Sequence, residues 1–366
     1  MKTTHPAPLP FRNVALRFRN VALPFRDVAA ALSALALATA GCGKDPAPAG
    51  DATATASDTA AKPADVAGPD AFLLDTSSPG KPGDPVAADL SPFLGGAGSA
   101  GAYVRKIADA KDLIGGAAAQ GKPGDFILGN GVVRYIVQGD DRHQGPCPWG
   151  GTVLDADVVR KAGEPGHDNV GEYCLLFHLG RTLLPKQFEI LADGSAGGPA
   201  VLRVTGPDTE NDFIHLTGLV AAFVGSAIEL PLNPDEDLPL TISRYFILRA
   251  DSPVLQVVTA MRNEGTAEIV THVGELADSG GQVEFFNPLS KMAGFGYGGF
   301  GSEPMAFLGF RGKDSSHLLS PAPAADGGPG GAYLSVSGVA GMLFGATDLL
   351  GLLLTPKAEI AAKPGA

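Results

Sequence analysis

Short runs of alternating apolar and polar residues, separated by turns, follow one another along the chain from Tyr103 onward. In VVRYIVQ, Val133, Tyr135 and Val137 fall on one face and Arg134 on the other. The longer runs LTISRYFILRAD and PVLQVVTAMRNEG show the same period. A period of two is that of a β-strand with one buried face. Further strands are expected at Gln187–Leu191, Ala200–Thr205, Phe213–Leu219, Met305–Phe310 and Ala332–Val336.

Turn residues separate these runs. In KPGDFILGNGVVRYIVQG, residues 122–139, a Pro-Gly turn and a Gly-Asn-Gly turn delimit two strands, and we interpret this stretch as scaffold. Asn263-Glu264-Gly265-Thr266 predicts a hairpin into Glu268–Val273. The chain holds 50 Gly and 30 Pro in 366 residues, with 45% apolar residues to form a core. We therefore predict an all-β fold, a large antiparallel β-sandwich.

Residues 1–41 carry the pattern of an export signal. Three near-copies of one heptad, PFRNVAL, RFRNVAL and PFRDVAA, cover Pro10–Ala30. A solenoid needs longer units and a coiled coil needs more heptads, so we interpret the copies as a duplication within the leader or as residues ahead of the true start. A basic region with Lys2 and four arginines precedes the uncharged stretch Val28–Ala40, which is too short to span a bilayer. This order predicts a signal peptide.

Cys42 follows the small residues Thr39-Ala40-Gly41 in a pattern that resembles a bacterial lipobox. The resemblance implies cleavage before Cys42, lipidation of its thiol, and a place at the outer membrane or the periplasmic face of the cell envelope. An ordinary secretory signal with an incidental cysteine is the alternative. Residues 42–97 are rich in Ala, Pro, Asp and Gly, which predicts a disordered tether with a reach of roughly 40 Å. Residues 98–366 would then form the β-sandwich body.

Two stretches of the body resemble known families. The run ISRYFILRADSPVLQVVTAMRNEGTAEIVTHVGELADSGG, residues 242–281, resembles the central sheet of the galactose-mutarotase-like β-supersandwich. Residues 121–139 and GGTVLDADVVR, residues 150–160, resemble the N-terminal, non-catalytic β region of bacterial envelope proteins that carry a PHP-type metallohydrolase domain of the carbaryl-hydrolase kind. These resemblances imply a supersandwich fold and do not by themselves imply an activity.

The residues of a PHP-type metal site are not in place. Such a site opens with two histidines one residue apart, and none of the seven histidines, at positions 5, 143, 167, 178, 215, 272 and 317, form such a pair. We therefore do not expect the hydrolase activity. The apolar segment Val336–Leu354 suggests a protein neighbour near the C-terminus, as the front part of a longer protein would need. Asp348 and several glycines argue against a membrane span there.

A sugar epimerase or lyase on this fold would need a general acid and a general base. His215, His272, Glu275 and Asp278 are candidates by residue type, and structural roles are the alternative. His272 and Glu275 would face opposite sides of a continuous strand.

A second acidic group lies earlier in the chain. It comprises Asp140, Asp141, His143, Asp155, Asp157, His167, Asp168 and Glu172. Asp155 and Asp157 would share a strand face, as ligands of a Ca²⁺ site could. The spacing matches no known calcium loop, so a solvated acidic loop is the default and we expect no metal or cofactor.

Cys147 and Cys174 remain once Cys42 is lipidated. In an oxidising compartment they suggest a disulfide, and free buried cysteines are the alternative. A disulfide would fasten the loop that carries Trp149, the only tryptophan. Aromatic residues in Gly-rich loops can stack on sugars, although core filling is commoner. They are Trp149, Tyr173, Phe295, Tyr297 and Phe300.

The net charge of −12 argues against nucleic acid as a partner. Together these observations lead us to expect an envelope lipoprotein with a non-catalytic, carbohydrate-binding body. The alternatives are a sugar epimerase or lyase on the same fold, and the front part of a metallohydrolase. The residues expected to contact a ligand are Trp149, Tyr173, His272, Glu275, Asp278 and Tyr297.

Overall fold

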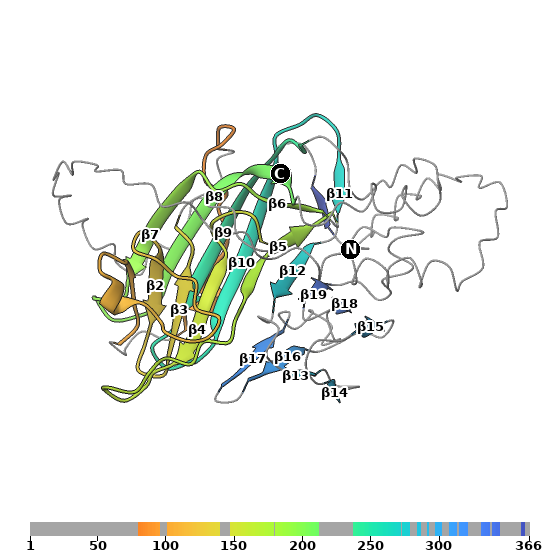
Figure 1. The fold of residues 1–366 in the computed structure, drawn as a ribbon. Helices are drawn as coiled ribbons and strands as arrows, with labels where there is room; N and C mark the ends of the chain where they lie inside the picture. Colours follow the sequence, from red (N-terminus) through yellow and green to blue (C-terminus); the bar gives the residue numbers. More distant parts are fainter. Residues whose placement is uncertain are drawn as a thin grey trace, which may run out of the picture. The chain divides into compact units, whose positions relative to one another are not determined.

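The computed structural model is almost entirely β (Figure 1). It describes residues 80–95, 101–139, 147–178, 180–211, 237–271, 273–278, 284–286, 291–292, 297–301, 307–312, 315–320, 331–336, 339–344 and 360–362. The expected signal peptide, Cys42 and the tether up to residue 79 lie outside the described residues, as does the strand expected at Phe213–Leu219. The predicted all-β, antiparallel sandwich architecture is confirmed.

Fourteen strands form one sheet that folds into two layers. Layer one has the order β1 (Tyr103–Lys106), β2 (Phe126–Gly129), β3 (Val133–Val137), β4 (Val153–Val158), β5 (Glu172–Phe177), β12 (Val273–Asp278), β19 (Val339–Phe344), β18 (Gly331–Val336) and β15 (Tyr297–Gly301). Layer two has the order β7 (Gln187–Asp193), β8 (Ala200–Glu210), β9 (Leu240–Leu248) and β10 (Leu255–Asn263). The short strand β6 (Arg181–Leu183) pairs with both β5 and β8 and so joins the layers.

Smaller elements complete the described part. β11 (Ile269–Thr271) pairs with β20 (Ile360–Ala362), and a four-stranded sheet has the order β14 (Lys291–Met292), β13 (Glu284–Phe286), β16 (Leu308–Arg311) and β17 (Ser316–Leu319). Within the described residues, helix is limited to α2 (Ser91–Leu94) and the 3₁₀ turn η2 (Ala110–Asp112).

The main core lies between the two layers, where β2, β3 and β4 lie over layer two in Figure 1. The alternation of side chains along each strand places one face of the strand in this core. Val133 and Val137 from β3 lie there with Ile242, Phe246 and Leu248 from β9. Burial of these aliphatic and aromatic side chains, at about 25 cal/mol per Å² of apolar surface, is the main force that holds the layers together. The side of layer one that carries these residues is called its inner face below, and the other side its outer face.

Residues 122–139 form the scaffold that the sequence predicts. β2 and β3 pair antiparallel around the turn at Asn130 and Gly131. The Oδ1 atom of Asn130 accepts hydrogen bonds from the backbone N–H groups of Val132 and Val133, at 2.8 and 2.9 Å. Its Nδ2 donates to the carbonyl of Arg249, at 2.8 Å, and to that of Ser252. One buried amide therefore closes the hairpin and ties it to the loop that follows β9.

Residues 80–95, which the sequence assigns to the tether, instead lie along the outer side of layer two. Leu90 is fully buried against Val201, Tyr245 and Ile247. The backbone N–H of Val86 donates to Ser243 Oγ at 2.9 Å, and its carbonyl accepts from Tyr245 Oη. The folded body therefore includes residues before the expected boundary at 98. We call residues 80–95 the strap.

The hairpin predicted at Asn263–Thr266 is wrong. β10 pairs with β9, whereas β11 pairs with β20, and β12 then joins β5 in layer one. The side chain of Asn263 does form the hydrogen bonds of a turn. Its Oδ1 accepts from the N–H of Gly265 and its Nδ2 donates to the carbonyl of Ala267. This turn carries the chain from one layer to the other instead of back along β10.

Part of the apolar C-terminal segment is built into layer one. β18 pairs with β15 and β19, and β19 pairs with β12 and β18, so both strands are hydrogen-bonded on both edges. Residues 345–359 lie outside the described residues, and the protein neighbour expected for Val336–Leu354 stays a prediction.

The strap makes a direct prediction about stability. Leu90→Ala should lower the free energy of unfolding by about 2–5 kcal/mol, because it leaves a cavity in a closed apolar cluster. Urea denaturation measures the change. Leu318→Ala is the control, since Leu318 is 58% exposed and its truncation should change stability by no more than about 0.5 kcal/mol. Equal small effects for both variants would show that the strap does not pack on the body.

Candidate functional site

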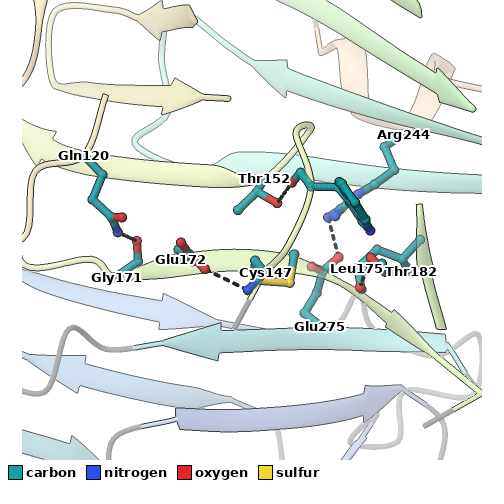
Figure 2. Close-up of a disulfide and its surroundings, with 11 residues drawn as sticks. Gln120, Cys147, Thr152, Gly171, Glu172, Leu175, Thr182, Arg244 and Glu275 are labelled. Atoms are coloured by element: carbon teal, nitrogen blue, oxygen red, sulfur yellow. Dashed lines mark hydrogen bonds and ion pairs between the residues drawn. A yellow bond between two sulfur atoms is a disulfide. The ribbon is translucent and has the colours of Figure 1, made fainter. Parts of the chain in front are cut away.

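Charged side chains of the candidate residues are buried on both faces of layer one. On the inner face, Glu275 of β12 lies opposite Leu175 of β5 and points toward layer two. There it meets Arg244 of β9, with 2.6 Å between Nη2 and Oε1. Figure 2 shows Arg244 extending from its strand to Glu275. The pair joins the two layers through the core.

The surroundings of this ion pair are apolar. The Arg244 and Glu275 side chains are 2% and 9% exposed, and the guanidinium lies 5.3 Å from the centre of the Phe246 ring. Burial raises the pKa of Glu275, and Arg244 acts in the opposite direction. Because its carboxylate is engaged inside the sandwich, Glu275 does not face a solvent-accessible surface, as a residue that contacts a ligand would.

The outer face of layer one carries a group of carboxyls. Asp155 and Asp157 share a face of β4, as predicted. They lie opposite Ile136 and Arg134 of β3, whose side chains are on the outer face. Glu172 of β5 lies opposite Asp278 of β12. Asp168 comes from the loop between β4 and β5. We call Asp155, Asp157, Asp168, Glu172 and Asp278 the outer carboxyls.

Two of the outer carboxyls, Asp155 and Asp168, accept hydrogen bonds from backbone N–H groups. Asp155 accepts from the N–H groups of Gln120, at 2.7 Å, and Gly121. Asp168 accepts from the N–H groups of Ala156, at 2.8 Å, and Val170. These bonds fasten the loops 115–121 and 166–170 onto the strands.

The two loops also hold each other. A parallel bridge joins Gly116 to Asp168, and the backbone N–H of Asp168 donates to the carbonyl of Gly115 at 3.0 Å. Gly116 has a φ of 151°, and a Cβ there would lie 2.2 Å from the nitrogen of Asp168. Only glycine fits at this crossing.

Burial favours the neutral form of three outer carboxyls. It raises the pKa of Asp155 to about 6, that of Asp168 to about 7 and that of Glu172 to about 8, and backbone N–H donors counteract the rise in each case. Neighbouring carboxyls raise these values further: Asp125 acts on Asp155, and Asp278 acts on Glu172. One oxygen of Asp168 and one of Glu172 have no hydrogen-bond partner among the described residues.

Asp157 behaves differently because a cation lies beside it. Burial opposes its ionisation, but Arg160, at 2.6 Å, and the N–H of His167 hold the pKa of Asp157 below its usual range. His317 of β17 lies near this pair, where burial lowers the pKa of the imidazole to about 4 and Asp157 acts in the opposite direction. The Asp157–His317 neighbourhood therefore combines an anionic carboxylate with a neutral imidazole at neutral pH.

Cys147 and Cys174 form a disulfide, so the free-cysteine alternative does not hold. Both cysteines are buried, together with Leu176 and Leu276. The N–H of Cys147 also donates to Glu172 Oε2 at 2.8 Å (Figure 2). The disulfide and this hydrogen bond both fasten the start of the loop 147–152 to β5.

The described residues among those expected to contact a ligand do not gather at one surface. Glu275 is buried. Tyr173 is half-buried against the main core, and its ring lies 6.2 Å from that of Phe310. Trp149 is half-buried and accepts a hydrogen bond at its carbonyl from Thr152. Asp278 lies on the outer face beside Glu172.

Several other candidates are less defined. Tyr297 is the first residue of β15, and its side chain is not among the described parts of the structure. His215, His272, Phe295, Asp140, Asp141 and His143 also lie outside the described residues. Within the ranges that are described, no group of three or more His, Cys, Asp or Glu residues could hold a metal ion. The Ca²⁺ site considered for the acidic group therefore has no support there.

Sequence reasoning missed two residues of this arrangement. Arg244 lies on the otherwise apolar inward face of β9, between Ile242 and Phe246, and a charge at such a position needs a buried partner. That signal was available and pointed to a carboxylate across the core. His317 gave no comparable signal, because its approach to Asp157 depends on how β16 and β17 lie against the loop after β4.

No family model, no curated protein and no solved structure matches this chain. The described helices include none long and apolar enough to cross a membrane.

The ion pair between the layers yields a prediction. Arg244→Met should lower the free energy of unfolding by about 3–5 kcal/mol, because it leaves Glu275 buried without a cation. Arg244→Met/Glu275→Leu should recover most of that loss. Urea denaturation of both variants and of Arg249→Met, which removes an exposed pair with Asp251 and should cost about 1 kcal/mol or less, measures the difference. A double variant less stable than Arg244→Met would contradict this role.

The outer carboxyls yield a prediction about pH. The pKa of Glu172 is raised to about 8, so between pH 4 and 8 the unfolded chain loses this proton while the folded chain keeps it. Stability therefore falls as pH rises through that window. Glu172→Gln removes the titrating group but keeps an acceptor for the N–H of Cys147.

The free energy of unfolding of Glu172→Gln should fall less than that of the wild type between pH 4 and 8, by on the order of a few kcal/mol. Thermal denaturation across this pH range tests it. Glu189→Gln, on a side chain that is 55% exposed, is the control for the change of residue type. Parallel pH profiles for the wild type and Glu172→Gln would refute the assignment.

Proposed function

We propose that this chain is a lipoprotein of the bacterial cell envelope, anchored through Cys42, whose β-sandwich body binds a ligand without catalysing a reaction. Carbohydrate is the proposed ligand class, and no cofactor is part of the proposal. The observation that carries the non-catalytic role is the Arg244–Glu275 pair, because it holds Glu275, one of the acid–base candidates, inside the core.

The export part of the proposal draws support from the Cys147–Cys174 disulfide. Structural disulfides form and persist in oxidising compartments, such as the periplasm and the cell surface. The signal-like residues 1–41 and the lipobox-like Thr39–Cys42 point in the same direction.

The carbohydrate part draws on the resemblance of residues 242–281 to a galactose-mutarotase-like sheet. Trp149 is the proposed contact, because this residue is half-buried, with its indole nitrogen buried, on a loop that the disulfide fastens to β5. A ring held in this way loses little conformational entropy when a sugar stacks on it.

A thermal-shift screen of the full chain with Cys42→Ser, against sugars, glycans and divalent metals, tests this function. A ligand that binds the native state should raise the melting temperature in proportion to RT ln(1 + [L]/Kd), and Trp149→Ala should remove that shift. A flat response to every compound would refute the binding role. Chemical conversion of a bound sugar, followed by NMR, would refute the non-catalytic role.

A further inference from the structure

β10 forms one edge of layer two. Among the described residues, β9 is the strand that pairs with it, over an unbroken register from Leu255–Leu248 to Asn263–Leu240. The other edge of β10 presents backbone N–H and C=O groups that no described strand pairs. Such an edge is a template for another extended chain, and natural proteins generally protect it.

The opposite edge of the same layer shows what that protection looks like. β7 carries a register shift between Ile190 and Ala192, and its charged residues include Glu189 and Asp193. A bulge and charges on an edge strand prevent a second chain from pairing with it. β1 is the edge strand of layer one and lies next to β7. It is four residues long and ends in Arg105 and Lys106.

Over Leu255–Met261, β10 has none of these devices, and the one charged residue of the strand, Arg262, is buried and pairs with Glu264. From Leu255 to Met261 its sequence, LQVVTAM, contains no charge, no proline and no glycine, and its register with β9 has no bulge. It is also nine residues long, more than twice the length of β1. A strand of this kind, left unpaired, would be expected to associate.

The stretch is also compatible with pairing to a copy of itself. If two copies pair antiparallel about Val258, Leu255 lies opposite Met261 and Val257 lies opposite Thr259. Residues opposite each other share a face of a sheet. Leu255 and Met261 both pack against the main core, whereas Val258 and Ala260 both pack against the outer cluster that contains Leu90, so this register keeps each face continuous between the copies.

We propose that β10 is the interface of a symmetric homodimer, in which the β10 strands of two copies pair antiparallel about Val258 and join their second layers into one continuous sheet. The occupant is a second copy of this chain, because the uncharged edge matches itself in length and face. The net charge of −12 opposes association over most of the surface, and LQVVTAM is where two copies approach without like charges opposite each other.

Sedimentation of the full chain with Cys42→Ser, over a dilution series, tests the dimer. The protein with wild-type β10 should form a dimer that dissociates on dilution. The Val257→Lys variant should be a monomer at every concentration. Ile190→Lys is the matched control on the protected edge, since Ile190 and Val257 are 36% and 37% exposed, and it should dimerise like the wild type. A monomeric wild type, or a dimer that survives Val257→Lys, would overturn the proposal.

Disulfide cross-linking tests the register and does not depend on whether Val257→Lys folds. Val258→Cys places the new thiol opposite its own copy and should give a covalent dimer under mild oxidation. Gln256→Cys places it opposite Ala260 and should cross-link much less. Equal cross-linking of the two variants, or cross-linking of neither, would overturn the proposed pairing.

Discussion

A charge buried in a protein core must be paired, and in this fold one pair spans the space between the two layers. Arg244 and Glu275 come from different layers and meet at 2.6 Å inside the main core. Neither side chain is tolerable there without the other, because an unpaired buried charge costs several kcal/mol. The pair therefore fixes how β9 lies over β12, and it makes structural residues of two groups that could otherwise serve in chemistry.

On the outer face of layer one, burial acts on a group of carboxyls whose charge depends on what lies beside them. Among the described residues, no ion pair engages Asp155, Asp168 or Glu172, and burial shifts each toward its protonated form. Each also accepts a backbone N–H from a segment that the layer must hold. Asp157, which has Arg160, stays ionised. The acidic group thus fastens loops, and its charge state depends on pH.

Alternation of apolar and polar residues was sufficient to predict β3, β7, β9 and β10, because each buries one face against the same core. Alternation could not predict that the chain leaves layer two after β10. The hydrogen bonds of the Asn263 turn are the same whether the next strand returns along β10 or crosses to layer one. The strap was missed because its Pro- and Ala-rich composition is that of a tether. Its few apolar side chains, Leu90 above all, are buried by layer two.

The candidate site was harder to predict than the fold. The sequence indicated that Asp155 and Asp157 share a face, because strand side chains alternate, and that Cys147 and Cys174 could pair, because an oxidising compartment was expected. It could not tell that Glu275 would meet Arg244, since that contact joins residues from two layers whose register is set by packing.

Five acidic residues of layer one and its loops are buried and are held by hydrogen bonds or ion pairs of the fold: Asp155, Asp157, Asp168, Glu172 and Glu275. NMR titration of ¹³C-labelled glutamate carboxyls measures their protonation directly, with Glu172→Gln to assign the signal of Glu172. The structure predicts that Glu172 stays protonated through neutral pH and titrates at about 8. A Glu172 signal that titrates near the ordinary value of about 4.3 would contradict the account, because it would place that carboxyl in water.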